Sequence, residues 1–341
     1  MMLYKLMRTL MFQLEAEKAH HLGLQGLALV QMSGLSSLLY SKVATAPVKV
    51  MGIDFPNAVG LAAGLDKNGD YIDALAAIGF GFIEIGTVTP RPQAGNPKPR
   101  LFRLPEANAF INRMGFNNLG VEHLVEQVKI AKQDTIIGIN IGKNFDTPVE
   151  NAVDDYLIGL KKVYSSADYI TINISSPNTP GLRALQFGES LNELLAALKE
   201  EQSSLQQQHQ RYVPMAVKVA PDLNADEVIQ LAKAFEQFEI DAVIAANTTM
   251  SREEVIGLPF SGEMGGLSGG PLFDKSTAIV RQFRQELPQN LPIIAAGGIM
   301  SGEDAVAKLD AGAELVQIYS GFIYQGPKLV SDIVHAINKR M

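Results

Sequence analysis

The sequence predicts an α/β protein whose main unit is a single (β/α)8, or TIM, barrel preceded by a small helical extension. Short apolar segments rich in β-branched residues alternate with amphipathic helical patterns along most of the chain. These strand and helix units extend over about 290 residues, which suits one closed barrel of this type. A doubly wound sheet is the competing architecture, but its Gly-x-Gly-x-x-Gly signature does not occur, and neither does the phosphate loop of nucleotide hydrolases.

Composition restricts the class of protein further. With 341 residues, 47% of them hydrophobic, the chain can bury a large core. A net charge of -7 and an isoelectric point near 5.4 argue against a general nucleic-acid binder, although they leave room for a local basic patch. The chain has no cysteine, which excludes disulfides, thiolate metal sites and a cysteine nucleophile or base.

Residues 1–40 predict a pair of amphipathic helices as a unit separate from the barrel of residues 48–341. The first apolar stripe covers residues 3–14, with Lys5 and Arg8 off the stripe, and the second covers residues 19–30. Such a pair either packs flat on the barrel or dips into a membrane interface and accepts a hydrophobic ligand. A linker is expected at residues 40–47. No run approaches the roughly 20 apolar residues that span a bilayer, so we expect no membrane crossing.

Eight predicted strands and eight helices make up the barrel. The strands are residues 58–62, 82–85, 136–139, 169–172, 215–219, 242–245, 292–295 and 315–318. The helices are residues 71–78, 121–132, 153–164, 191–205, 226–238, 277–287, 302–310 and 328–337. Two connections, residues 87–118 and 248–276, are long, and we expect both on the C-terminal face because each follows a strand.

Residues just past each predicted strand converge on one mouth if the barrel is correct. They are Ala63, Gly64, Asp66, Lys67, Gly86, Thr87, Asn140, Gly142, Lys143, Asn173, Ser176, Asn178, Lys218, Asn247, Thr248, Gly297, Gly298, Tyr319, Ser320 and Gly321. The set is rich in amides, which suit a flat heterocycle that offers donors and acceptors. None of the five histidines follows a strand, which argues against a histidine base or metal site, and no metal is expected.

Residues 169–182 change abruptly from a β-branched strand to a polar loop. Asn173, Ser176, Asn178 and Thr179 fall within seven residues, and prolines restrict the backbone around them. The segment is therefore either an ordinary Ser/Asn/Pro turn or a rigid site at a strand end.

Glycine-rich segments indicate a phosphate-bearing cofactor. Residues 295–299 and 319–321 follow the last two strands, where barrels commonly bind phosphate through exposed backbone amides. Paired glycines alone also mark plain turns, but together with the glycine-rich loop at residues 265–269 they favour a cofactor site.

Two lysines at the predicted mouth have both a functional and a structural interpretation. Lys218 lies in an apolar strand and either reaches a strand edge or faces an anionic cofactor; beside a flavin it would stabilise negative charge on the reduced ring. Lys67 either binds a substrate carboxylate or is solvated.

Six segments in order closely resemble the class 2 (quinone-dependent) dihydroorotate dehydrogenases. They are residues 62–67, 86–93, 99–104, 112–118, 173–182 and 265–269, and the likeness extends over essentially the whole chain, N-terminal helices included. The resemblance implies a flavin mononucleotide (FMN) barrel that oxidises dihydroorotate to orotate in de novo pyrimidine (UMP) biosynthesis. Electrons pass to a membrane quinone, ubiquinone or menaquinone, and the protein binds peripherally to the cytoplasmic face of the cell membrane.

The resemblance also implies residue roles. Ser176 is the base for the C5 proton while hydride leaves C6 for FMN; Thr179 and a water relay the proton, and Lys67 completes the catalytic set. Class 1 relatives use a cysteine as the base, which this chain lacks. The implied substrate-binding residues are Lys67, Asn112, Arg113, Met114, Gly115, Phe116, Asn173, Asn178, Asn247 and Thr248. The implied FMN-binding residues are Ala63, Gly64, Leu65, Asp66, Lys67, Thr87, Asn140, Asn173, Lys218, Ala246, Gly269, Gly298, Tyr319 and Ser320.

One residue departs from the family pattern. Ala246 stands where threonine is expected in close relatives, so one hydrogen bond should differ without loss of the site.

For the quinone, the resemblance implies a hydrophobic tunnel in the helix pair. Met7, Met11, Phe12 and His20 are the implied lining residues, and Arg103 meets the head group.

Two other functions remain compatible with the sequence. The first is an FMN barrel with another substrate or acceptor, such as a dihydropyrimidine reductase or a fumarate-linked enzyme, which would not need the N-terminal helices. The second is a non-catalytic barrel that binds a phosphorylated ligand or scaffolds a membrane partner, and such a protein would be colourless when purified.

Overall fold

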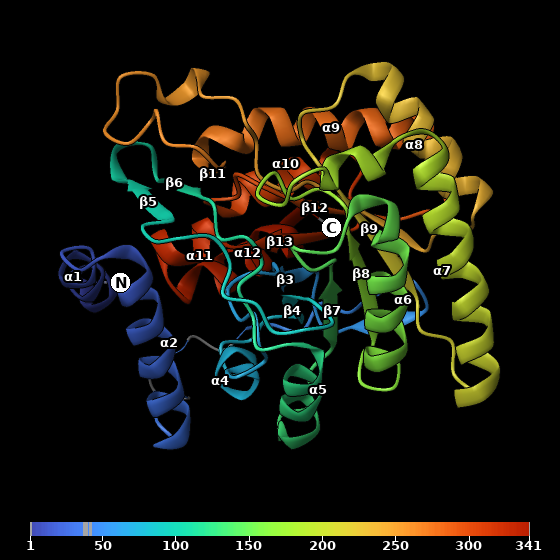
Figure 1. Ribbon diagram of the computed structural model, residues 1–341. Helices are drawn as coiled ribbons and strands as arrows, with labels where there is room; N and C mark the ends of the chain where they lie inside the picture. The colour runs from blue at the N-terminus through green and yellow to red at the C-terminus, as the bar shows by residue number, and fades with distance from the viewer. Residues whose placement is uncertain (1, 37–39, 41–42, 341) are drawn as a thin grey trace.

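The protein forms a closed barrel of eight parallel strands, with helices packed around it (Figure 1). The structure is a computed structural model that describes residues 2–36, 40 and 43–340. Around the barrel the strands follow the order β10, β12, β13, β3, β4, β7, β8 and β9. Their bounds are β3 Val59–Leu61, β4 Phe82–Val88, β7 Ile137–Ile141, β8 Tyr169–Asn173, β9 Met215–Val219, β10 Ala242–Ala245, β12 Ile293–Ala296 and β13 Leu315–Ile318. The predicted α/β barrel and all eight of its strands are confirmed.

The eight predicted barrel helices are present with shifted ends. Their bounds are α4 Ile72–Ala76, α5 Val121–Ile130, α6 Ala152–Val163, α7 Gly188–His209, α8 Ala225–Gln237, α9 Phe273–Glu286, α10 Gly302–Asp310 and α12 Lys328–Arg340. Helix α8 begins where Asn224 and Glu227 form a capping box. A further short helix, α11 (Ser320–Gln325), follows β13 and was not predicted.

Aromatic rings fill the lower half of the barrel interior. Phe82 and Tyr169 are fully buried with ring centroids 6.1 Å apart, and a side chain at Gly60 or Gly138 would collide with them. Above these rings the interior becomes polar around the buried carboxylate of Glu84. The functional residues therefore lie in the upper half of the barrel.

Two small antiparallel sheets were not predicted. Strands β1 (Val48–Val50) and β2 (Ile53–Phe55) form a hairpin before the barrel. The two long connections supply β5 (Leu101–Leu104), β6 (Ala109–Asn112) and β11 (Gly266–Gly269), which pair in the order β11, β6, β5. Both connections follow barrel strands, as expected. Their strands pair with one another in a single sheet, whereas the sequence had suggested two separate loops. Their partners lie far apart in sequence, which local patterns cannot reveal.

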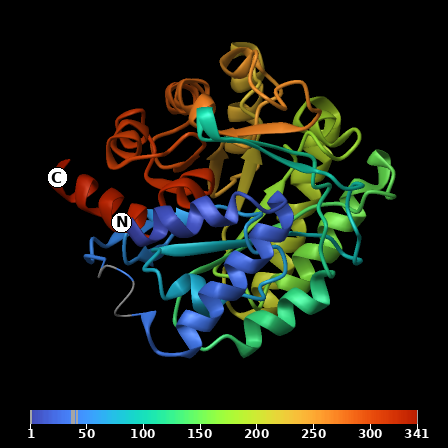
Figure 2. The ribbon, with the colours of Figure 1, turned by 90° about the vertical axis from the view of Figure 1, so that its left-hand side faces the viewer.

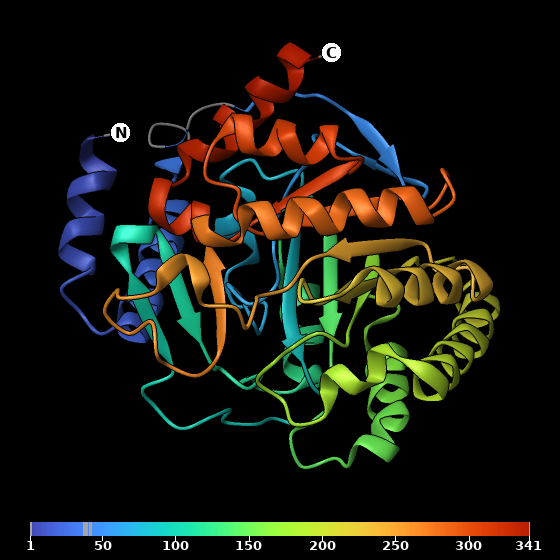
Figure 3. The ribbon, with the colours of Figure 1, turned by 90° about the horizontal axis from the view of Figure 1, so that it is seen from above.

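The N-terminal helices lie against one side of the barrel, next to the β5 and β6 strands (Figures 2 and 3). Helix α1 spans Met2–Met11 and α2 spans Ala16–Met32, close to the predicted ranges. The hydroxyl of Tyr4 donates to the carbonyl of Ile323 at 2.6 Å, and Phe12 packs edge-on against Tyr324. The predicted linker includes residues 41 and 42, which lie outside the described residues.

Candidate active site

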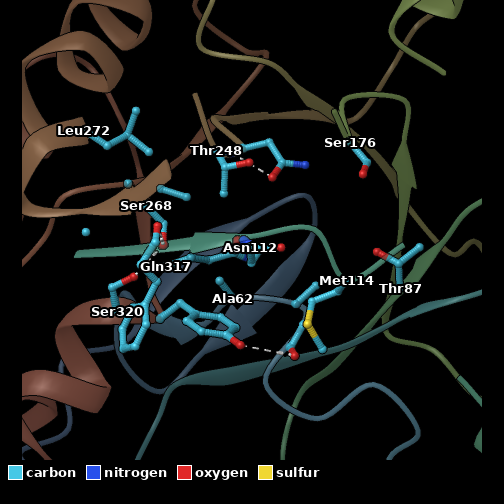
Figure 4. A pocket seen from close by; sticks show the side chains of 18 of the residues that line it. Ala62, Thr87, Asn112, Met114, Ser176, Thr248, Ser268, Leu272, Gln317 and Ser320 are labelled. Carbon is cyan, nitrogen blue, oxygen red and sulfur yellow. Dashed lines mark hydrogen bonds between the residues drawn. The ribbon is translucent and has the colours of Figure 1, made fainter. Parts of the chain in front are cut away.

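One cavity opens at the C-terminal mouth of the barrel. It is lined by residues that follow the barrel strands, by the β6 and β11 strands and by α2. Figure 4 shows Ser268 and Ser320 at one end and Ser176 and Thr87 at the other. The empty space between these walls, which includes the open solvent at the mouth, is about 1280 Å³.

Most of the predicted site residues line this cavity. They are Ala63, Gly64, Lys67, Thr87, Asn112, Met114, Gly115, Phe116, Asn173, Ser176, Asn178, Lys218, Ala246, Asn247, Thr248, Gly269, Gly298, Tyr319 and Ser320. His20, predicted on the quinone path, lines it as well.

Five predicted site residues are not among the described residues that line the cavity: Leu65, Asp66, Arg113, Asn140 and Thr179. The carboxylate of Asp66 accepts hydrogen bonds from three backbone N–H groups at the start of the next helix. Arg113 turns outward to the carboxylate of Glu263 at 2.7 Å. Leu65 and Thr179 are buried beside the cavity, and Asn140 lies behind its wall.

The side chain of Ser176 is buried at the end of the cavity and has few local contacts. Its Oγ accepts a hydrogen bond from the backbone N–H of Asn178 at 3.2 Å. The neighbouring Ser175 Oγ accepts from Asn247 at 3.0 Å and donates to Asn173 at 3.1 Å. Residues of the β8 and β10 strand ends are thereby joined directly behind Ser176.

The amides at the mouth form two hydrogen-bonded groups, one around Asn173 and one between Asn112 and Asn178. Asn173 Nδ2 donates to Thr87 Oγ1 at 2.9 Å and to Asn140 Oδ1 at 3.2 Å, and Asn140 donates in turn to Glu84 at 2.8 Å. A longer contact of 3.4 Å joins Asn178 to Asn112. Because each amide is oriented by a neighbour, the donors and acceptors that face the cavity are preorganised.

Two basic side chains near α2 have lowered pKa values. Burial lowers the pKa of Lys67 to about 8, opposed by the charge of Glu17, and its Nζ donates to the carbonyl of Gly64 at 2.8 Å. Burial and then the charge of Lys67 lower the pKa of His20 to about 3, so the imidazole is neutral at physiological pH. A neutral ring suits contact with an uncharged ligand better than a general-base role.

At the centre of the cavity, several polar atoms lack the partners that burial normally demands. Among the described residues, Gln317 Oε1 and Thr248 Oγ1 are buried without a hydrogen-bond partner, and both side chains line the cavity. Lys218 is also buried here, and burial lowers its pKa against the opposing charge of Glu84. These groups indicate that a polar or anionic ligand belongs in the cavity.

Close backbone packing shapes the end of the cavity near Ser268. The hydroxyl of Ser320 donates to Ser268 Oγ at 3.0 Å. Gly298 has a φ of +77° and abuts the backbone of Phe273 so closely that a Cβ would lie 2.3 Å from its Cα. Beneath, the buried Lys308 donates to Ser276 Oγ at 2.6 Å, and Ser276 Oγ donates to the carbonyl of Gly297 at 3.0 Å. Burial lowers the pKa of Lys308 to about 7.

Sequence reasoning missed several lining residues. Examples are Glu17, Leu101, Phe110, Ser268 and Gln317. Glu17 comes from α2, before the barrel, and Leu101 and Phe110 come from the antiparallel sheet, well beyond the end of β4. Gln317 is a polar residue within the apolar strand β13, and this polar position in a buried strand could have indicated a side chain that faces the cavity.

No helix among residues 2–36, 40 and 43–340 is both long and apolar enough to cross a membrane.

Comparisons with known proteins agree over nearly the full chain. Residues 45–341 match the family model described as dihydroorotate dehydrogenase. A curated relative from Azotobacter vinelandii, named dihydroorotate dehydrogenase (quinone), is 59% identical over 335 residues, covering 98% of this chain and 96% of its own. The relative of that name from Ectopseudomonas mendocina is 60% identical, covering 98% of each chain. The crystal structure of DHODH from Eimeria tenella in complex with ferulenol is 35% identical, with a TM-score of 0.85 over 93% of this chain and 90% of its own.

Proposed function

The chain belongs to the dihydroorotate dehydrogenase family, and from this premise we propose how its cavity performs the reaction. The enzyme oxidises dihydroorotate to orotate with a quinone as electron acceptor, a step of pyrimidine biosynthesis. The family match argues against the other FMN barrels and the non-catalytic scaffold.

We propose FMN as the cofactor because the residues present fit it. The phosphate would lie at the backbone of Gly298 and at the side chains of Ser268 and Ser320. Only glycine fits at position 298, because a Cβ there would collide with the backbone of Phe273. The ring would lie against Lys218 and Gln317, both buried. Among the described residues, Gln317 Oε1 has no hydrogen-bond partner, so it could accept from the ring. FMN, when bound, supplies the acceptor for the hydride from C6 of dihydroorotate and hands the electrons to quinone.

Ser176 would remove the proton from C5 of dihydroorotate. A serine hydroxyl is a poor base unless its own proton has an acceptor, and the buried Thr179 with a water would provide that relay. Asn178 donates its backbone N–H to Ser176 Oγ, which helps to hold the oxygen and favours its negatively charged form.

The four asparagines at the mouth would hold the pyrimidine ring. Asn112, Asn173, Asn178 and Asn247 all line the cavity, and each can donate and accept. Lys67 would bind the substrate carboxylate, because its pKa of about 8 leaves it mostly charged at neutral pH. Thr248 Oγ1, buried and without a hydrogen-bond partner among the residues that the structure describes, would complete the set.

The quinone would reach the cavity along α2. His20 lines the cavity from this helix, and Arg103 donates to the carbonyls of Phe12 and Leu14 at 3.1 and 2.8 Å, between the helices. The exposed apolar side chains of α1 support peripheral contact with the cytoplasmic face of the membrane.

Anaerobic reduction of the purified protein tests the proposal. We expect a yellow protein whose visible absorption bleaches on addition of dihydroorotate and returns on addition of a short-chain quinone. Bleaching without recovery would retain the substrate and reject the acceptor. A colourless protein would reject FMN, and absence of bleaching would reject the proposed chemistry of the cavity.

Ser176→Ala tests the base. The variant should retain FMN, because Ser176 and the Ser268 end lie at opposite ends of the cavity, and its flavin reduction should fall by about 100-fold or more. Stopped-flow reduction by dihydroorotate gives the rate, and the ratio of visible to ultraviolet absorption gives the FMN content. Near-normal reduction would remove Ser176 from the role of base.

A further inference from the structure

Arg183 joins two segments of the candidate site without lining its cavity. It lies in the 3-10 helix η3 (Leu182–Gln186), which follows the Ser176 loop. Its Nε donates to the carbonyl of Ser175 at 3.1 Å and its Nη2 to the carbonyl of Thr248 at 2.9 Å. Among the described residues that line the cavity, Arg183 is absent. Its guanidinium therefore acts on the backbone behind the cavity wall.

Asp222 fixes Arg183 from the opposite side. Arg183 Nη1 donates to Asp222 Oδ2 at 3.0 Å, so all three guanidinium nitrogens are used. Asp222 also accepts from the hydroxyl of Thr249 and from the backbone N–H of Met250 at 2.9 Å. Burial alone would raise the pKa of Asp222, but its hydrogen bonds outweigh burial and the pKa is lowered, so the carboxylate is charged.

This arrangement differs from an ordinary surface ion pair. The side chains of Arg183 and Asp222 are 25% and 22% exposed, and together they connect the loops after β8, β9 and β10. An isolated exposed pair contributes about 0–1 kcal/mol, because it restrains only two side chains. Here two nitrogens of one rigid, planar guanidinium donate to two backbone carbonyls and so fix the distance between them.

The two carbonyls belong to the segments on which the proposed chemistry depends. Ser175 precedes the proposed base, and Thr248 follows Asn247, which is proposed to hold the pyrimidine. Asn247 also donates to Ser175 Oγ at 3.0 Å, so a second hydrogen bond joins the same two segments.

We propose that Arg183, anchored by Asp222, is a positioning residue for proton abstraction: it holds the Ser176 loop at a fixed distance from the substrate-binding Asn247–Thr248 segment. The inference rests on the proposed role of Ser176. A misplacement of about 1 Å at a reacting group can cost about 100-fold in rate, and Arg183 prevents a shift of that size.

Stopped-flow reduction of the FMN-loaded variants by dihydroorotate tests the inference. Arg183→Met should lower the limiting rate by about 100-fold. Its FMN content should stay unchanged, and its affinity for orotate, measured by calorimetry, should change much less than the rate. Asp222→Asn removes the charge, but its single amide oxygen can still accept from Arg183 and from the backbone N–H of Met250. This variant should show a smaller loss in the same direction.

Combination with Ser176→Ala separates positioning of the base from general weakening of the structure. If Arg183 acts through Ser176, Arg183→Met should cause little further loss on the Ser176→Ala background. An equal loss on both backgrounds would overturn the inference, as would a limiting rate that Arg183→Met leaves unchanged. If Arg183→Met does not fold, the same cycle is measured with Asp222→Asn.

Arg211 provides a matched control. It also joins a carbonyl, of Ala167, and a carboxylate, of Asp168, but it precedes β9 at the other end of the barrel. Arg211→Met should leave the limiting rate within about twofold of the wild type. An equal loss in both variants would overturn the inference. Failure of dihydroorotate to bleach the wild type would instead reject the proposed function, and this inference with it.

Discussion

Lys67 shows how burial adjusts a single side chain for its proposed task. The surrounding protein shields its ammonium group from water and lowers its pKa to about 8, and the charges of Glu17 and Asp66 limit the fall. At neutral pH most molecules therefore carry a charged Lys67, which is what a substrate carboxylate requires. A modest rise in pH removes that charge.

Orotate binding should consequently weaken as the pH rises through about 8. Loss of the Lys67 proton removes the ion pair, so the dissociation constant should rise by up to about tenfold per pH unit above this value. Calorimetry between about pH 7 and pH 9 measures the dissociation constant of orotate. The Lys67→Met variant serves as the reference, because any change that it shows with pH comes from ionisation of orotate itself. Parallel pH profiles for the wild type and Lys67→Met would contradict this role.

At the scale of elements, one buried ion pair attaches α2 to the barrel. Arg100 donates to Glu17 at 2.7 Å, with 6% and 4% of the two side chains exposed, and also donates to the carbonyls of Ala94 and Asn96. Burial alone would raise the pKa of Glu17, but the hydrogen bond and charge of Arg100 outweigh it and the pKa is lowered. Helix α2 is therefore part of the wall of the cavity and is held there by charge.

Glu17→Gln should loosen α2 and lower the free energy of unfolding by about 3 kcal/mol, because it leaves the buried Arg100 without its counter-charge. Urea titration measures this change, and Lys98→Met, which removes only the exposed partner of Glu17, should cost less than about 1 kcal/mol.

The free energy of unfolding that Glu17→Gln loses should become smaller as the pH falls. Folding lowers the pKa of Glu17 below its ordinary value of 4.5. The ion pair therefore contributes fully to the free energy of unfolding above pH 4.5, and this contribution is lost as the pH falls through the pKa of the folded state. A difference between the wild type and Glu17→Gln that grows on acidification would contradict the ion-pair account.

At the scale of the whole molecule, α1 has exposed apolar side chains and lies against α11. Leu6 and Leu10 are 60% and 65% exposed on this helix, and Arg8 binds the carbonyl of Tyr324 on α11. Figures 2 and 3 show the helix pair on one side of the molecule, next to β5 and β6. The proposed membrane-bound acceptor would approach from that side.

Replacing Leu6 and Leu10 by glutamate should reduce binding to phospholipid vesicles by at least about tenfold. Reduction by dihydroorotate and reoxidation by a short-chain quinone should stay unchanged, whereas reoxidation by a long-chain quinone in vesicles should slow. Vesicle co-sedimentation measures the binding. Ile130→Glu on α5, at an apolar residue 62% exposed, is the matched control, and equal losses in both proteins would exclude a specific role for α1.

The sequence by itself determined the barrel, because buried parallel strands are continuous apolar runs whose composition is local. It also indicated many of the cavity residues, since the carboxyl ends of such strands must meet at one mouth. Others, such as Asn112, were implied only by the family resemblance.

Only the tertiary structure decided what depends on residues far apart in the chain. The pairing of β6 with β11, the entry of Glu17 and Phe110 into the cavity and the contact of Arg183 with Thr248 all arise this way. The sequence did not reveal the direction of some side chains. Asp66 and Arg113 follow the sequence pattern of site residues, yet Asp66 binds backbone N–H groups of the turn before α4 and Arg113 binds Glu263. The physical reason is that the order of residues sets which strand ends are neighbours, whereas packing sets which side chain turns toward the cavity.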